Sequence, residues 1–131
     1  MAEPPPFGLL LSDDLLDGSR VTATARAAGF EVRQVRSVDA LMACGRAEAP
    51  SCVLVDLHNP ALDVAALVRE VSSLFPRPRL VGYGSHVDAA RLRAARQAGC
   101  DEVMPRSQFF EVLESRLSDW FGVNNKLDPG R

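Results

Sequence analysis

The sequence predicts an α/β fold in which five strands and five helices alternate, a (βα)5 doubly wound parallel five-stranded sheet. Short apolar segments recur five times along the chain, and each is followed by a segment with helical spacing of apolar residues. This alternation with short connections is typical of a parallel sheet with right-handed crossovers and helices on both faces. Residues 7–12 and 51–56 are almost continuously apolar, as in strands covered on both faces.

The predicted strands cover residues 7–12, 30–35, 51–56, 79–84 and 101–104. The second of them mixes apolar and charged residues, which favours a place at the edge of the sheet.

The predicted helices cover residues 15–28, 37–48, 62–74, 86–98 and 107–121. Gly29 and Gly99 stand where the first and fourth helices should end, as terminating glycines do. Ser37 is the expected N-cap of the second helix. The run Ser85–Asp88 has the pattern of a capping box and predicts the start of the fourth helix.

The length of 131 residues predicts one domain. Residues 1–6 contain three consecutive prolines and are expected to form an extended leader. The domain is expected over residues 7–121, and residues 122–131 are expected to form a flexible C-terminal tail.

Composition excludes several classes of function. The formal net charge of −2 gives no basic face for nucleic acid. No apolar run approaches the roughly 20 residues of a membrane span, and the N-terminus does not resemble a signal peptide. The three cysteines are odd in number and form no C-x-x-C pair, which indicates reduced thiols. We therefore expect a cytoplasmic protein without nucleic-acid or membrane partners.

Acidic residues gather at the predicted carboxyl ends of the strands, where functional groups of such sheets collect. Asp13 and Asp14 follow the first strand, and Asp56 ends the third. Converging carboxylates can hold Mg²⁺, and a carboxylate beside Mg²⁺ can attack phosphorus. The alternative for Asp14 and Asp17 is a purely structural one, in which they favour the start of a helix through its dipole.

The segment Asp56-Leu57-His58-Asn59-Pro60 resembles the D-x-x-M-P turn of response-regulator receiver domains, and Ala98-Gly99 resembles the end of their fourth helix. The resemblance covers residues 7–121. It implies a flavodoxin-like receiver fold with strand order 2-1-3-4-5 and Asp56 as phosphoacceptor. The acidic pair of the family falls on Ser12 and Asp13, or after a shift of one residue on Asp13 and Asp14.

The chain departs from the family at the lysine that ends the fifth strand. Matching the following proline places Met104 there, whereas counting from Gly99 places Arg106 there. Phosphoryl transfer needs positioned positive charge. Methionine supplies none, and a guanidinium is not interchangeable with an ammonium.

Two further family positions also differ. The hydroxyl residue that ends the fourth strand falls on Gly84, with Ser85 next to it. The switch aromatic of the fifth strand falls on Glu102 or Val103. The relay that would report phosphorylation is therefore incomplete.

Two surfaces are candidates for binding. The first is the rim around Ser85 and His86, where two glycines flank Tyr83 and could let a ligand approach the backbone. The second lies on the fourth and fifth helices and combines arginine with aromatic residues, as interfaces often do. Its residues are Arg91, Arg106, Phe110 and Trp120.

We interpret the sequence as an atypical receiver, or pseudo-receiver: a non-enzymatic protein-interaction module of bacterial signal transduction, independent of phosphorylation and of any cofactor. Its expected partner is a protein of a signalling pathway, with a homodimer through the fourth and fifth helices as one form. One alternative is a working receiver phosphorylated on Asp56 with Mg²⁺. Another is a flavodoxin-like binder of a small molecule at the rim of residues 84–86.

Overall fold

The structure, a computed structural model, describes residues 5–123. The predicted ends of the leader and tail, residues 1–4 and 124–131, lie outside the described part. The strands form one parallel sheet in the order β2-β1-β3-β4-β5, which confirms the predicted topology. They are β1 (Phe7–Leu11), β2 (Glu31–Val35), β3 (Cys52–Asp56), β4 (Arg79–Gly84) and β5 (Glu102–Pro105).

Five helices alternate with the strands, as predicted: α1 (Leu15–Ala27), α2 (Val38–Ala47), α3 (Val64–Ser72), α4 (Ala89–Ala98) and α5 (Arg106–Trp120). Ser37 caps α2 by accepting a hydrogen bond from the Ala40 amide, and Gly99 ends α4 with a φ of 118°. Both predicted helix boundaries are therefore confirmed.

The start of α4 differs from the prediction. Asp88, not Ser85, is its N-cap, and the helix begins at Ala89 instead of residue 86. The Ser85 hydroxyl instead accepts a hydrogen bond from the Val87 amide at 3.3 Å. The serine closes a local turn, so the loop after β4 is longer than the capping-box pattern indicated.

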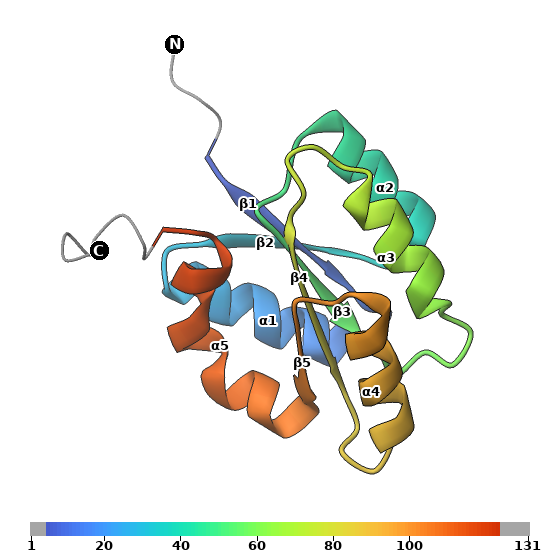
Figure 1. Cartoon of the computed structure of the whole chain (residues 1–131). Helices are drawn as coiled ribbons and strands as arrows, with labels where there is room; N and C mark the ends of the chain where they lie inside the picture. Colours follow the sequence, from blue (N-terminus) through green and yellow to red (C-terminus); the bar gives the residue numbers. More distant parts are fainter. Residues whose placement is uncertain (1–4, 124–131) are drawn as a thin grey trace, which may run out of the picture.

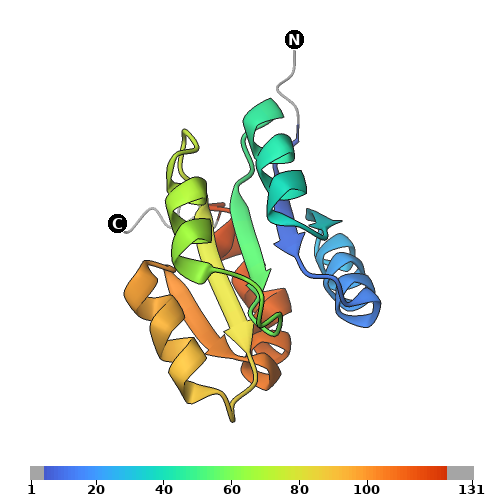
Figure 2. The same ribbon diagram turned by 90° about the vertical axis from the view of Figure 1, so that its right-hand side faces the viewer.

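Helices cover the sheet on both faces (Figure 1), with α1 and α5 on one face and α2, α3 and α4 on the other. Alternate residues of a strand point to opposite faces, so Leu9 and Leu11 pack on one side and Leu10 on the other. The carboxyl ends of the strands meet at one edge, seen at the bottom of Figure 2. Within the described residues, no helix has the length and apolarity needed to cross a bilayer.

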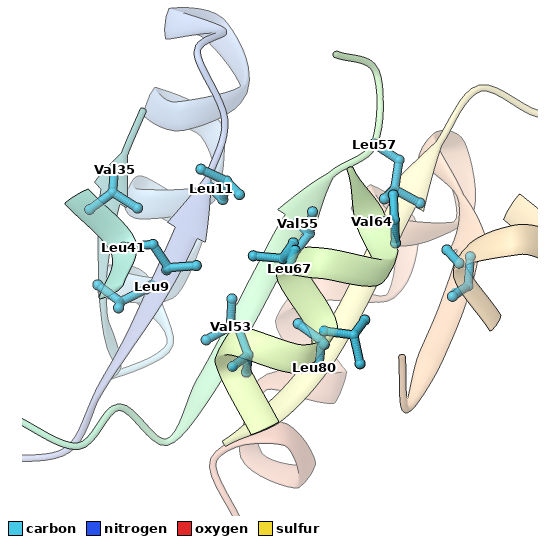
Figure 3. Close-up of a cluster of buried hydrophobic side chains, with 14 of the residues drawn as sticks. Leu9, Leu11, Val35, Leu41, Val53, Val55, Leu57, Val64, Leu67 and Leu80 are labelled. Atoms are coloured by element: carbon cyan, nitrogen blue, oxygen red, sulfur yellow. The ribbon is translucent and has the colours of Figure 1, made fainter. Parts of the chain in front are cut away.

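The two faces of the sheet have different cores. The face under α2, α3 and α4 is almost entirely aliphatic (Figure 3), with leucine and valine side chains such as Leu9, Val53 and Leu67. The face under α1 and α5 contains the large aromatic side chains Tyr83, Phe109 and Trp120. The buried side chains on both faces are closely packed, so their shapes fix how the helices lie on the sheet.

Candidate functional site

Asp56 ends β3 at the edge formed by the carboxyl ends of the strands, and only 9% of its surface is exposed. Its Oδ2 accepts a hydrogen bond from the Ser12 hydroxyl at 2.7 Å, and its Oδ1 accepts one from the His58 amide at 3.0 Å. Ser12 is 4% exposed. The place next to Asp56 is therefore taken by a hydroxyl that donates to the carboxylate, where a metal site would use a second carboxylate.

The other two predicted metal ligands lie on different sides of Asp56. Asp13 is exposed and lines a small cavity of about 50 Å³ that Asp56 also lines. Asp14 caps α1 by accepting a hydrogen bond from the Asp17 amide at 2.9 Å. Over residues 5–123, no group of three or more histidine, cysteine or acidic side chains is placed to hold a metal ion. Mg²⁺ binding by Asp13, Asp14 and Asp56 stays a prediction that this arrangement does not favour.

One row across the sheet contains the residues that matter for phosphoryl chemistry. Asp56 pairs with Tyr83 of β4, and Tyr83 pairs with Met104 of β5. Directly paired residues of neighbouring parallel strands point to the same face of the sheet. The ring of Tyr83 therefore lies in the row between Asp56 and Met104.

The two candidates for the lysine position, Met104 and Arg106, have different surroundings. Met104 is 5% exposed and packs in the aromatic core, so it brings no charge to Asp56. Arg106 is the first residue of α5, and its guanidinium forms hydrogen bonds with both carboxylate oxygens of Asp17. Among the described residues, no salt bridge involves Asp56. In the part of the chain that the structure describes, the Asp56 carboxylate thus has no ion-pair partner.

Asp17 is a site residue that the sequence did not reveal. Its side chain is 3% exposed, and besides Arg106 it binds the Tyr83 hydroxyl, which donates to Oδ2 at 3.2 Å. Asp17 lies in the first turn of α1 and Asp14 is its N-cap, so both stand at the helix start, as the structural alternative has it, and Asp17 has these two further contacts besides. We call Asp17, Tyr83 and Arg106 the Asp17 latch, because they join α1, β4 and α5.

Tyr83 anchors this latch in the core. The side chain is fully buried and its ring stacks on Phe109 at a centroid distance of 4.2 Å. Burial, followed by the nearby carboxylates of Asp56 and Asp17, raises the pKa of the Tyr83 hydroxyl far above its ordinary value. The hydroxyl is therefore a permanent hydrogen-bond donor to Asp17 near neutral pH.

The glycines around Tyr83 do not open the backbone to a ligand. A Cβ at Gly82 would lie 3.1 Å from Leu57, and a Cβ at Gly84 would lie 3.3 Å from Leu57 and from Leu92. The space left by the glycines is filled by these leucine side chains. The two glycines therefore no longer support the alternative of a small-molecule site at residues 84–86. The other rim residue, His86, is exposed.

Arg91 holds the loop that follows Asp56. From α4, its guanidinium donates to the carbonyl oxygens of Leu57 and Asn59, each at 2.7 Å, and to that of Leu62 at 3.0 Å. We call this arrangement the Arg91 clamp. Arg91 was predicted to be part of an interface, but its Nε and Nη2 groups bind backbone carbonyls of the protein itself.

One residue of the predicted interface on the fourth and fifth helices is not at the surface. Trp120 is 2% exposed and stacks on Phe109 in the core, and its Nε1 donates to Glu102 at 3.0 Å. The prediction of Trp120 as an exposed anchor is wrong. Phe110 is half-buried, with the guanidinium groups of Arg20 and Arg106 over its ring at 4.1 and 4.9 Å. The amphipathic spacing of α5 places two of its aromatics, Phe109 and Trp120, inward instead.

A depression of about 220 Å³ lies at the strand-end edge beside Asp56. Its lining comes from the start of α1, the ends of β3 and β4, and the start of α5: Asp14, Asp17, Asp56, His58, Gly84, Ser85 and Arg106. The depression contains three carboxylates and one guanidinium. It thus has an excess of negative charge beside the candidate phosphoacceptor.

Solved structures with the same fold cover nearly the whole chain. A response regulator from Chloroflexus aurantiacus J-10-fl is 20% identical over 91% of this chain and 99% of its own, with a TM-score of 0.76. The receiver domain of a sensor histidine kinase from Pseudomonas aeruginosa PAO1 has a magnesium ion in its active-site cleft. It is 19% identical over the same shares, with a TM-score of 0.75. The chain has the fold of a response-regulator receiver domain.

An atypical orphan response regulator, described as having a phosphorylation-independent regulatory mechanism, also has this receiver fold. It is 12% identical over 88% of this chain and 95% of its own, with a TM-score of 0.73. No family model matches the chain.

One curated protein matches in sequence, the L-lactate dehydrogenase B chain of Oryctolagus cuniculus, at 33% identity over 82 residues. The match covers 58% of this chain and 36% of that protein, so the chain spans little more than a third of its length. Here β1 is followed by Ser12, Asp13 and Asp14, without the G-x-G-x-x-G pattern of dinucleotide-binding folds.

Proposed function

We propose that this chain is a pseudo-receiver, a non-enzymatic protein-interaction module of bacterial signal transduction that works without phosphorylation of Asp56. The observation that carries the proposal is the absence of a cation at Asp56 within the described residues. Met104 is buried in the core, and Arg106 is bound to Asp17. A phosphoryl group on Asp56 would find the guanidinium that lines the depression, that of Arg106, already bound to Asp17 and not directed at Asp56.

The row across the sheet supports the proposal independently. Ser12 donates to the Asp56 carboxylate, so one of the oxygens that would attack phosphorus is already an acceptor in the folded state. Tyr83 lies between Asp56 and Met104, one of the two candidates for the lysine position, and is stacked on Phe109. A single substitution at Met104 would therefore not restore the contact.

The fixed geometry of the two loops supports a surface that is already formed. The Asp17 latch holds the start of α1 to the start of α5, and the Arg91 clamp holds the loop after β3. A receiver that switches must change its strand-end loops between two arrangements. Here both sides of the edge are tied down, which favours constitutive recognition by a protein partner. A homodimer through α4 and α5 stays one form of that recognition.

The test is a reaction of the full chain with acetyl phosphate and Mg²⁺, read by intact mass. We expect no stable adduct of one phosphoryl group, while a phosphorylatable receiver treated in parallel acquires it. An adduct that appears on this chain and disappears in Asp56→Asn would show instead that the chain is a working receiver.

A further inference from the structure

Three of the four large apolar side chains that are exposed among the described residues stand at the strand-end edge. Leu15 and Leu16 in the first turn of α1 are 66% and 82% exposed, and Val87 in the loop before α4 is 79% exposed. Phe75, the fourth, is 96% exposed in the segment between α3 and β4. Grouped exposed apolar side chains often mark an interaction site.

These apolar residues are close in sequence to residues that line the depression beside Asp56 from two different elements. Leu15 and Leu16 stand between Asp14 and Asp17, which line it from α1. Val87 follows Ser85, which lines it from the other side. Figure 2 shows the start of α1 and the loop between β4 and α4 on either side of the strand ends. The lining of the depression is mostly charged or polar, and exposed apolar residues lie next to it in the chain, in α1 and in the loop before α4.

The charges that line the depression indicate which kind of side chain would bind there. Arg106 is bound to Asp17, which leaves Asp14 and Asp56 without an ion-pair partner among the described residues. Each oxygen of Asp56 accepts one hydrogen bond, from Ser12 or His58, and a carboxylate oxygen has room for a second. A cationic side chain entering the depression would meet an acceptor that is nine-tenths buried, where charge pairs are less screened than at an open surface.

We propose that this edge is a docking surface for a protein segment with one arginine or lysine side chain between apolar ones. The basic side chain lies in the depression beside Asp56 and Asp14, and its apolar neighbours cover Leu15, Leu16 and Val87. The partner thereby supplies the cation that Met104 does not. This inference rests on the proposed function, because it assigns the edge to a partner instead of a phosphoryl group.

The experiment is a titration of the ¹⁵N-labelled full chain with a short capped peptide that has one arginine between leucines. The matched probe has citrulline, which is neutral and nearly the same shape, in place of arginine. We expect amide shifts at His58 and Ser85 and an affinity on the order of tenfold higher for the arginine peptide. Equal affinities, or shifts confined to α4 and α5, would overturn the docking surface.

Variants separate the charged from the apolar contribution. Asp56→Asn should remove most of the arginine preference, and Asp14→Asn, which keeps a capping side chain, should remove part of it. Leu16→Ser should weaken both peptides, whereas Phe75→Ser, an equally exposed apolar residue away from this edge, should weaken neither. Equal effects of Leu16→Ser and Phe75→Ser would refute specific docking.

The last measurement is a titration of the same labelled chain with Mg²⁺ alone. If Mg²⁺ produces the same shifts at His58 and Ser85 and competes with the peptide, the edge is a metal site and the docking surface is wrong. The phosphorylation assay is read by mass and does not depend on this result. A chain that is not phosphorylated yet binds no arginine peptide would leave the proposed function standing and refute only this inference.

Discussion

Two arginines hold the two sides of the strand-end edge, and they do so with different chemistry. On the side of α1 and α5, Arg106 binds a carboxylate, Asp17, that is 3% exposed. On the side of α4, Arg91 binds three backbone carbonyls of the loop after β3. The first contact pairs charges next to an aromatic core, and the second pairs a charge with neutral acceptors near water.

The difference predicts which side is essential for folding. Removing a cation from a buried carboxylate leaves an uncompensated charge, which is costly. Removing donors from the carbonyls of Asn59, which is exposed, and Leu62, which is half-buried, lets water replace them at little cost, and only the Leu57 carbonyl belongs to a buried residue. We therefore expect the α1 and α5 side to determine the stability of the domain, and the α4 side to determine the mobility of its loop.

The largest expected effect lies in the aromatic core beneath the Asp17 latch. Trp120→Ala should lower the free energy of unfolding by about 3–5 kcal/mol, because it removes a buried ring stacked on Phe109 and a hydrogen bond to Glu102. Phe110→Ala, at a half-buried position, should cost clearly less. Urea unfolding of both variants measures this. Equal small losses would mean that Trp120 is not part of the core.

Breaking the Asp17 latch comes next in size. Arg106→Ala should cost about 2–3 kcal/mol, less than for a fully buried pair, because half of the Arg106 side chain is exposed and Tyr83 still donates to Asp17. A double-mutant cycle with Asp17→Asn measures the coupling. The double variant should be more stable than Arg106→Ala alone, because the stranded charge is gone. Additive losses would show that the two side chains do not interact.

The sequence predicted the fold because the fold depends on local patterns. Ser37 and Gly99 mark helix boundaries by chemistry that involves only their neighbours. The start of α4 was misplaced because Ser85 and Asp88 are both good capping residues within one turn. Pattern alone does not decide between two such residues, and packing of the loop does.

The candidate site was only partly predictable, because some of its contacts join residues that are far apart in the chain. Asp56 and Ser12 end adjacent strands, so their contact follows from the topology. Asp17 binds Tyr83 and Arg106, which are 66 and 89 residues away in the chain. Nothing in the sequence near Asp17 distinguishes it from an acid at a helix start. Its spacing, three residues after the capping Asp14, is the ordinary pattern of a helix start and does not indicate these distant partners.

The aromatic side should also respond to alkaline pH. Burial raises the pKa of the Cys52 thiol from 9.0 to about 12, in the same core cluster as Tyr83. The folded state therefore holds this proton more tightly than the unfolded state, and stability should fall as the pH rises above about 9. Below that pH the thiol is protonated in both states and contributes no slope. Urea unfolding at about pH 8 and pH 10 should show a loss that is about 1 kcal/mol smaller in Cys52→Ala. An unchanged loss would contradict the assignment to Cys52.

The smallest energetic effect should come from the Arg91 clamp, and its signature is kinetic. Arg91→Ala should lower the free energy of unfolding by less than about 1 kcal/mol, because water can bind the released carbonyls of the exposed Asn59 and the half-buried Leu62. The loop after β3 should nevertheless open more often, so its amides should exchange faster while those of α1 and α5 are unchanged. Hydrogen exchange followed by NMR at the Leu62 amide, which bonds to the Asn59 carbonyl at 3.1 Å, reads this directly.

Arg93→Ala is the matched control for the clamp. Arg93 is an exposed arginine of the same helix, and the structure gives it no hydrogen bond to the loop after β3. Its removal changes the charge of α4 by the same amount as Arg91→Ala, so faster exchange in both variants would point to charge and not to the clamp. Faster exchange in Arg91→Ala alone would show that one side chain fixes the loop beside Asp56. If Arg91→Ala also speeds exchange in α1 and α5, the two sides of the edge are coupled, and the proposed division between a stability side and a mobility side is wrong.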